Sequence, residues 1–376
     1  MGGIDEKSGE MSKARNSRVE ILRIIAMLLI LMNHFLQMDM MQVACYPVRA
    51  INTLLCRLGG VGDDIFFGIS AYYLCARKSD VKSSLRRSWK LEIELLFYSV
   101  VFFIIILVIG FSLNFWPLGY RDTLFLGVKS FFPVLGNLWW YPTSYVMFLF
   151  ILPALNWCLK RIGPTGHGLI AIGCFAFSSF LNVQGLQPGH NVILFIYLYI
   201  LISFFRWNHA WVFASFKLGA LLFGVGGFVG FLDVVLTSLF DEAAAYGSFL
   251  NNPAAFPSIL IALGLFIMQM SKSNVECRQV NIIASATLVP YLITAHPWFD
   301  EMTLFEMKKG FMNFGHSSLN IVARLIAIVG FFVICVIVEI FRRKIYSLPI
   351  LKRFFDFDTF FNKFERLFVS FKGDLR

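Results

Sequence analysis

Long apolar runs, separated by short polar or basic segments, do more than any other feature to limit the folds open to this sequence. Hydrophobic residues make up 58% of the 376 residues and charged residues 15%, whereas soluble domains are about half apolar and about a quarter charged. About ten of the runs approach the length that an α-helix needs to cross a bilayer. Because a backbone in lipid must satisfy its own hydrogen bonds, we predict an all-α fold, a polytopic transmembrane helix bundle.

The runs divide the chain into three parts. Residues 1–18 are predicted to form a polar, basic tail, and residues 19–341 the transmembrane domain. In residues 342–376 phenylalanines recur at helical spacing between charged residues, which predicts an amphipathic helix on the membrane surface. The predicted spans cover about residues 19–38, 55–76, 91–112, 139–159, 168–183, 191–205, 211–232, 253–270, 280–299 and 318–341.

The formal net charge of +10 is distributed by side of the membrane. Most of the 33 lysines and arginines fall before the first run, after the last one, or in the segments that return to the same side. By the positive-inside rule, this distribution predicts a multi-pass protein of the cell inner (plasma) membrane with both termini in the cytoplasm. The basic composition therefore indicates topology and contact with membrane lipids, and it does not indicate nucleic-acid binding.

The first apolar run carries a cation near its beginning and an imidazole near its end. Arg23 and His34 are eleven residues apart, which in an α-helix places them on one face and about 16 Å apart along it. This arrangement suits a long ligand with phosphates at one end and a reactive group at the other, as in acetyl coenzyme A. The alternative is that Arg23 is a membrane-edge cation and His34 an interfacial histidine.

Two aspartates and a second histidine are expected at the depth of His34. Asp63 and Asp64 come early in the second predicted span, and His296 comes late in the ninth. A carboxylate beside a histidine orients the ring and stabilises its protonated form, so we predict that Asp64 supports His34 as a general base. Alternatively, one aspartate caps the second helix while the other faces water, and His296 is interfacial.

Two further segments near the second span have more than one interpretation. The basic segment from Arg77 to Lys90 is first an orientation signal, but it also lies on the side from which a phosphate-rich cytosolic donor would approach. The run Gly59-Gly60-Val61-Gly62 lacks the strand context of a nucleotide-binding loop. We interpret these glycines as positions where two helices approach closely.

Several stretches of the chain carry a resemblance to a known family. They are Arg23-x10-His34, VGDDIFFGISAY at 61–72, LWWY at 138–141 with the later Pro153, and the Tyr-Leu pair before His296. Together they resemble the acyltransferase-3 family of integral-membrane O-acyltransferases, over roughly residues 18–340.

The sequence departs from the family pattern at several motif positions. Asp63 stands where the family has an apolar residue, Ala71 where it has glycine, and Glu20 where it has aspartate. The family's Arg-x-x-Arg before the third span is kept only as Arg87-x-x-Lys90. Lysine lacks the bidentate fork of arginine, so the departure bears on how the acyl donor is held.

The resemblance implies an enzyme that moves an acyl group, commonly acetyl, from cytosolic acetyl-CoA to a hydroxyl of a glycan or lipid-linked glycan, such as an exopolysaccharide unit. It implies that His34 is the catalytic histidine, and no metal is expected. The complete hypothesis assigns His34 and Asp64 to catalysis, Arg23, Arg86, Arg87 and Lys90 to the donor, and Glu20, Asp63, Ser70 and His296 to substrate binding.

Two other classes of membrane protein fit part of the pattern. In a transporter or flippase for a lipid-linked sugar, the same aspartates and histidines would form a proton relay. Transporters often have paired halves with broken helices at corresponding positions, and the sequence shows no such repeat. A glycan polymerase would need neither coenzyme A nor the arginines at the inner face.

Overall fold

The computed structural model describes the chain as a set of helices. The described residues are 15–36, 46–77, 79–116, 118–180, 191–239, 250, 252–299, 318–349 and 355–362. Within these ranges every regular element is helical, which confirms the all-α prediction. The helices are α1 (Ser17–Leu36), α2 (Tyr46–Cys75), α3 (Val81–Leu113), α4 (Tyr120–Phe131), α5 (Trp140–Arg161), α6 (Gly163–Phe180), α7 (Val192–Asn208), η1 (Ala210–Ala214), α8 (Phe216–Leu239), α10 (Phe256–Met270), α11 (Arg278–Ser285), α12 (Leu288–Thr294), α13 (Pro297–Phe299) and α15 (Ser318–Tyr346).

Helices occupy each segment that is predicted as a span, but they differ in length and polarity. α7 and α10 are apolar but short, and α2 carries Arg57, Asp63 and Asp64 within its length. In the part of the chain that the structure describes, five helices are long and apolar enough to cross a membrane. They are Ser17–Leu36, Val81–Leu113, Trp140–Arg161, Phe216–Thr237 and Ile321–Tyr346. The count of about ten spans stays a prediction.

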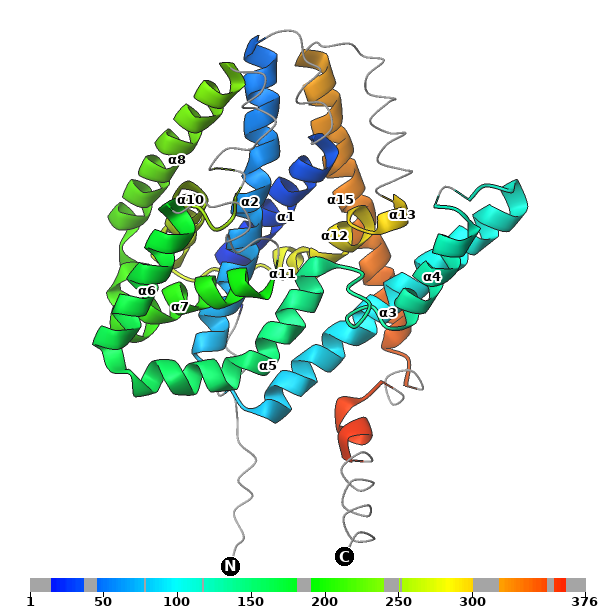
Figure 1. Ribbon diagram of the computed structural model, residues 1–376, viewed down its shortest axis with the longest axis horizontal. Helices are drawn as coiled ribbons and strands as arrows, with labels where there is room; N and C mark the ends of the chain where they lie inside the picture. The colour runs from blue at the N-terminus through cyan, green and yellow to red at the C-terminus, as the bar shows by residue number, and fades with distance from the viewer. Residues whose placement is uncertain are drawn as a thin grey trace, which may run out of the picture.

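α1 lies at the centre of the bundle and packs against α2, α10, α11, α12 and α15. Figure 1 shows α8 and α6 on one side of α1 and α2, and α3 and α4 on the other. Two glycines of α2 permit the close approach to α1. A Cβ atom at Gly62 would lie 2.6 Å from the Ala26 carbonyl oxygen, and one at Gly59 would lie 2.5 Å from the Asn33 Cβ. The interpretation of these glycines as close-packing positions is confirmed.

The segment predicted as one span over residues 280–299 is broken into α11, α12 and α13. Pro290 has no N–H to donate to the Ala286 carbonyl, and in a continuous helix its ring would clash with that carbonyl. The chain therefore turns at Ala286 and Thr287, and the Thr287 hydroxyl donates to the Ala284 carbonyl at 2.8 Å. The break lets α11 and α12 both contact α1.

A buried ionic cluster centred on Glu339 ties α15 to α3. The Glu339 side chain is fully buried. It accepts two hydrogen bonds of 2.7 Å from Arg342, one of 2.6 Å from Arg343 and one of 2.7 Å from the Tyr98 hydroxyl. A buried charge is tolerated only when it is compensated in this way, so the cluster fixes the end of α15 against the middle of α3.

Residues 355–362 dock on the first turns of α3. Asp358 pairs with Arg86, and the Trp89 ring stacks on Phe360 with 4.4 Å between ring centroids. Residues 357–362 are helical. Residues 342–346 of the predicted amphipathic segment instead continue α15. Residues 350–354 and 363–376 lie outside the described residues.

Candidate active site

A polar cavity of about 670 Å³ lies at the end of the bundle where α1 begins. Its wall contains four arginines, from the residues before α1 and from α1, α11 and α15, and two glutamates, Glu94 on α3 and Glu276 before α11. Guanidinium groups match phosphates in a bidentate geometry, so the cavity suits a ligand that carries several phosphates. We call it the arginine cavity after its arginines, Arg15, Arg23, Arg278 and Arg343.

Arg23 is held at the cavity wall by an ion pair within α1. Its Nη1 donates to Glu20 Oε2 at 2.7 Å, one helical turn earlier. The Glu20 side chain is 6% exposed and that of Arg23 is 19% exposed. The start of α1 is itself anchored, because the Ser17 N–H donates to the Val275 carbonyl at 2.8 Å. In this geometry Glu20 positions Arg23.

His34 lies near the other end of α1 and contacts α12. Its Nδ1 lies 2.8 Å from Thr294 Oγ1, and its ring centroid lies 6.1 Å from that of Tyr291. Thr294 is buried, and its hydroxyl donates to the Pro290 carbonyl at 2.9 Å. The broken helix therefore supplies the contact to Nδ1.

A row of aromatic side chains spans the interval between the arginine cavity and His34. Phe66 lines the cavity and lies 5.6 Å from Tyr141 between ring centroids. Tyr141 lies 6.1 Å from Tyr291, which in turn lies 6.1 Å from His34. Tyr141 is also within electrostatic range of Arg23. Among the described residues His34 is not part of the cavity wall, and this row of rings lies between the two.

The two aspartates of α2 are both buried and point in different directions. Asp63 lies within electrostatic range of Tyr141 and Tyr291, whereas Asp64 lies within range of Tyr197 on α7. Consecutive helical residues diverge by about 100°, which accounts for the difference. Neither oxygen of Asp64 accepts a hydrogen bond from any residue that the structure describes. The structure therefore shows no hydrogen bond between Asp64 and His34, and the support of His34 by Asp64 stays a prediction.

The three cations that were predicted on α3 also differ in direction. Arg86 pairs with Asp358, and Lys90 is exposed. Arg87 is directed inward: its Nη1 is buried without a hydrogen-bond partner in the described ranges, and it lies within electrostatic range of Tyr145. None of the three lines the arginine cavity as the structure describes it. Arg87 is the one of the three that faces the interior.

Ser70 and His296 occupy different environments. Ser70 lines the arginine cavity, and its hydroxyl donates to the Phe66 carbonyl at 3.3 Å. His296 is fully buried, with ring centroids 5.0 Å from Phe102 and 5.9 Å from Trp139. Neither of its ring nitrogens has a hydrogen-bond partner among the described side chains and backbone. The structure therefore brings Ser70 to the cavity and places His296 in a separate aromatic surrounding.

Sequence reasoning missed four residues of this region, the first of which is Arg15 in the predicted basic tail. Arg278 and Arg343 belong to basic segments whose charge was explained by topology alone, and they line the cavity only because α11 and α15 converge on α1. Thr294 is a hydroxyl in the apolar stretch 290–296. The one available signal was the proline four residues before it, which predicts a helix break.

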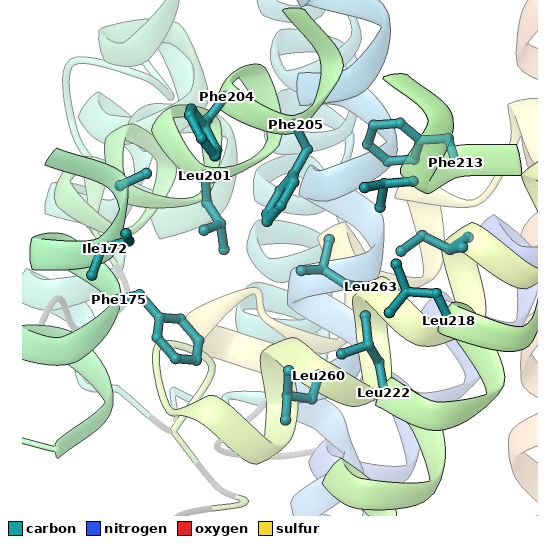
Figure 2. Close-up of a pocket in the computed structure, with 13 residues that line it drawn as sticks. Ile172, Phe175, Leu201, Phe204, Phe205, Phe213, Leu218, Leu222, Leu260 and Leu263 are labelled. Carbon is teal, nitrogen blue, oxygen red and sulfur yellow. The ribbon is translucent and has the colours of Figure 1, made fainter. Parts of the chain in front are cut away.

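A second pocket lies between α6, α7, α8 and α10 and has a volume of about 280 Å³. Figure 2 shows Leu201, Phe205 and Leu263 among the side chains around it. All its described lining residues are apolar. It offers no acid, base or nucleophile, so the candidate active site is the region between the arginine cavity and His34.

The described helices that are long and apolar enough to span a bilayer indicate an integral-membrane protein. The arginine cavity and the contact of His34 with Thr294 give it a polar centre. The model of the acyltransferase-3 family, described as an acyltransferase domain, matches residues 16–340. The chain belongs to this family and is a membrane acyltransferase. No curated protein and no solved structure matches it.

Proposed function

We propose that this acyltransferase moves an acetyl group from cytosolic acetyl-CoA to a hydroxyl of a cell-surface or lipid-linked polysaccharide. One observation carries the proposal: α1 presents Arg23 in the wall of the arginine cavity and holds His34 eleven residues further on. At about 1.5 Å per residue, the two residues are about 16 Å apart along the helix. This separation supports a donor with phosphates at one end and a thioester at the other.

The arginine cavity is the proposed site of the donor's phosphates. Arg23, Arg278 and Arg343 come from three helices, so they approach a bound ligand from different directions. Charge-assisted bonds from guanidinium to phosphate are strong and directional. The thioester would then extend along Phe66 and Tyr141 towards His34.

The proposed reaction is a direct transfer. His34 Nε2 takes the proton of an acceptor hydroxyl, and the resulting oxygen attacks the thioester carbonyl carbon. The new C–O ester bond forms and the C–S bond breaks. The coenzyme A thiolate leaves and recovers the proton from His34, so the histidine returns to its neutral form.

The proposal includes a topology. The arginine cavity would face the cytosol, and His34 would be reached by an acceptor from the outer side. The concentration of lysine and arginine at one side supports this orientation. The proposed topology has about ten spans in the inner (plasma) membrane. Both termini are then cytoplasmic, and the amphipathic C-terminal segment lies at the inner surface.

A flippase for a lipid-linked sugar is the second candidate function. The observation that favours it is the burial of Asp63 and Asp64 within α2, since buried carboxylates in membrane helices often serve proton relays. A flippase would transport its substrate without adding any group to it.

The test is transfer of label from radiolabelled acetyl-CoA to candidate glycans in membranes that contain the protein. We expect label on the glycan, and we expect His34→Ala to abolish it while the protein stays folded. His209→Ala, at the exposed end of α7, is the matched control and should retain the activity. Full activity in the His34→Ala variant would show that His34 takes no part in the mechanism. Transport of an unlabelled glycan would favour the flippase.

A further inference from the structure

The contact between α1 and α12 bears on which nitrogen of His34 carries the proton. The Thr294 hydroxyl has one hydrogen, and the Pro290 carbonyl is placed to accept it at 2.9 Å. When the hydrogen is directed there, the same oxygen acts towards His34 Nδ1, at 2.8 Å, only as an acceptor. In that arrangement Nδ1 carries a hydrogen, and in the neutral ring the lone pair is on Nε2.

We propose that Thr294 is the positioning residue of His34: its hydroxyl holds the imidazole in the tautomer whose Nε2 accepts the proton of the acceptor. This inference rests on the proposed function and adds a residue to it. A base must have its lone pair directed at the reacting hydroxyl, and a fixed tautomer supplies that direction. A hydroxyl provides this orientation without adding a charge to the site.

The local fold explains why a threonine occupies this position. Thr294 is the last residue of α12, which begins after the break caused by Pro290. Its hydroxyl reaches back four residues to the Pro290 carbonyl, a common arrangement for threonine in a helix. Tyr291 is on the same helix with its ring near that of His34, so α12 contacts the imidazole with two side chains.

The first measurement is steady-state acetyl transfer by variants of the full-length protein in membranes. Thr294→Val keeps the shape and removes the hydroxyl. We expect it to lower kcat by about tenfold to a hundredfold, which is at most the lower end of the contribution of general-base catalysis, and to leave the KM for acetyl-CoA unchanged. Thr294→Ser restores the hydroxyl and should recover most of the kcat.

The matched control is Thr123→Val on α4. Thr123 is also buried, and its hydroxyl also donates to a carbonyl four residues earlier, that of Gly119, at 2.8 Å. Thr123 is on α4, which Figure 1 shows apart from α1, the helix that carries His34. Loss of a buried threonine hydroxyl as such would affect both variants equally, and that result would overturn the positioning role. An unchanged kcat in Thr294→Val would also overturn it.

The second measurement does not depend on turnover. Solid-state NMR of protein labelled with nitrogen-15 histidine reports which ring nitrogen is protonated, and a spectrum of His34→Gln identifies the His34 signals by difference. We expect a protonated Nδ1 in the wild type and a loss of this preference in Thr294→Val. If this result holds while no glycan is acetylated, the proposed function fails and the positioning role stands. If Nδ1 is unprotonated in the wild type, the positioning role is wrong whatever the activity.

Discussion

At the scale of single residues, the direction of a side chain decides its role more than its charge does. Arg86 and Arg278 are both arginines in basic segments. Arg86 is paired with Asp358 outside the arginine cavity, whereas Arg278 lines the cavity wall. Substituting each of these two arginines in turn therefore tests where the phosphates of the donor bind.

We predict that Arg278→Ala raises the KM for acetyl-CoA by about tenfold or more with little change in kcat. The reason is the loss of a charge-assisted hydrogen bond to phosphate, worth roughly 1.5–3 kcal/mol. Arg86→Ala should leave the KM near that of the wild type. The measurement is initial-rate kinetics with varied acetyl-CoA. If Arg86→Ala raises the KM and Arg278→Ala leaves it unchanged, the phosphates bind beside α3.

At the scale of elements, the site depends on how closely α2 approaches α1. The Cβ atom of any larger residue at Gly62 would meet the carbonyl oxygen of Ala26 at 2.6 Å. Backbone cannot move aside as a flexible side chain can. The helix that carries Asp63 and Phe66 would then be displaced from the helix that carries His34.

We predict that Gly62→Ala lowers the thermal unfolding temperature of the purified protein, in keeping with a cost of about 1–3 kcal/mol for overpacking, and reduces its activity. Gly224→Ala is the matched control, because a Cβ atom there has nothing within 4 Å. It should unfold at the wild-type temperature or slightly above. Equal unfolding temperatures for the two variants would show that the α1–α2 contact is looser than described.

The break in the ninth predicted span has a different consequence at this scale. α11 directs Arg278 to the arginine cavity, while α12 directs Thr294 to His34. A continuous helix through Pro290 would change the angle between these two pieces. The proline therefore contributes to the site although its own side chain takes no part in the chemistry.

At the scale of the whole molecule, the orientation in the membrane decides which substrate meets which residue. The loop of residues 271–277 is hydrogen-bonded to the start of α1, since the Cys277 N–H donates to Ser17 Oγ at 2.7 Å. This loop and the arginine cavity must therefore lie on one side. The segment between α3 and α4, at the far end of α3 from its basic first turns, is predicted to lie on the other side.

We predict that a membrane-impermeant maleimide labels Asn274→Cys only in inside-out vesicles and Arg121→Cys only in intact cells. Both positions are exposed. The background should replace Cys75, Cys158, Cys174 and Cys277 by serine, because these four thiols are not fully buried. Cys45, which lies outside the described residues, is replaced with them. Labelling of Asn274→Cys from outside would place the arginine cavity away from cytosolic acetyl-CoA and would contradict the proposed function.

Much of the fold could be predicted from the sequence, because burial in lipid leaves few options for the backbone. The apolar runs gave the helices, the glycines of α2 gave a close contact, and the motif around Arg23 gave the family. Arg278 and Thr294 could not be found in this way. Each acquires its place from a neighbour that is more than two hundred residues distant in the sequence.

The sequence by itself therefore determined that the chain is a helical membrane protein of the acyltransferase-3 family with Arg23 and His34 on one helix. Hydrophobicity and helical periodicity are local properties, so residues close in the chain are sufficient to reveal them. Only the tertiary structure decided that Arg278 and Arg343 share a cavity with Arg23, and that Thr294 contacts His34. Those contacts depend on how the helices pack, and the packing is set by side chains from the whole bundle at once.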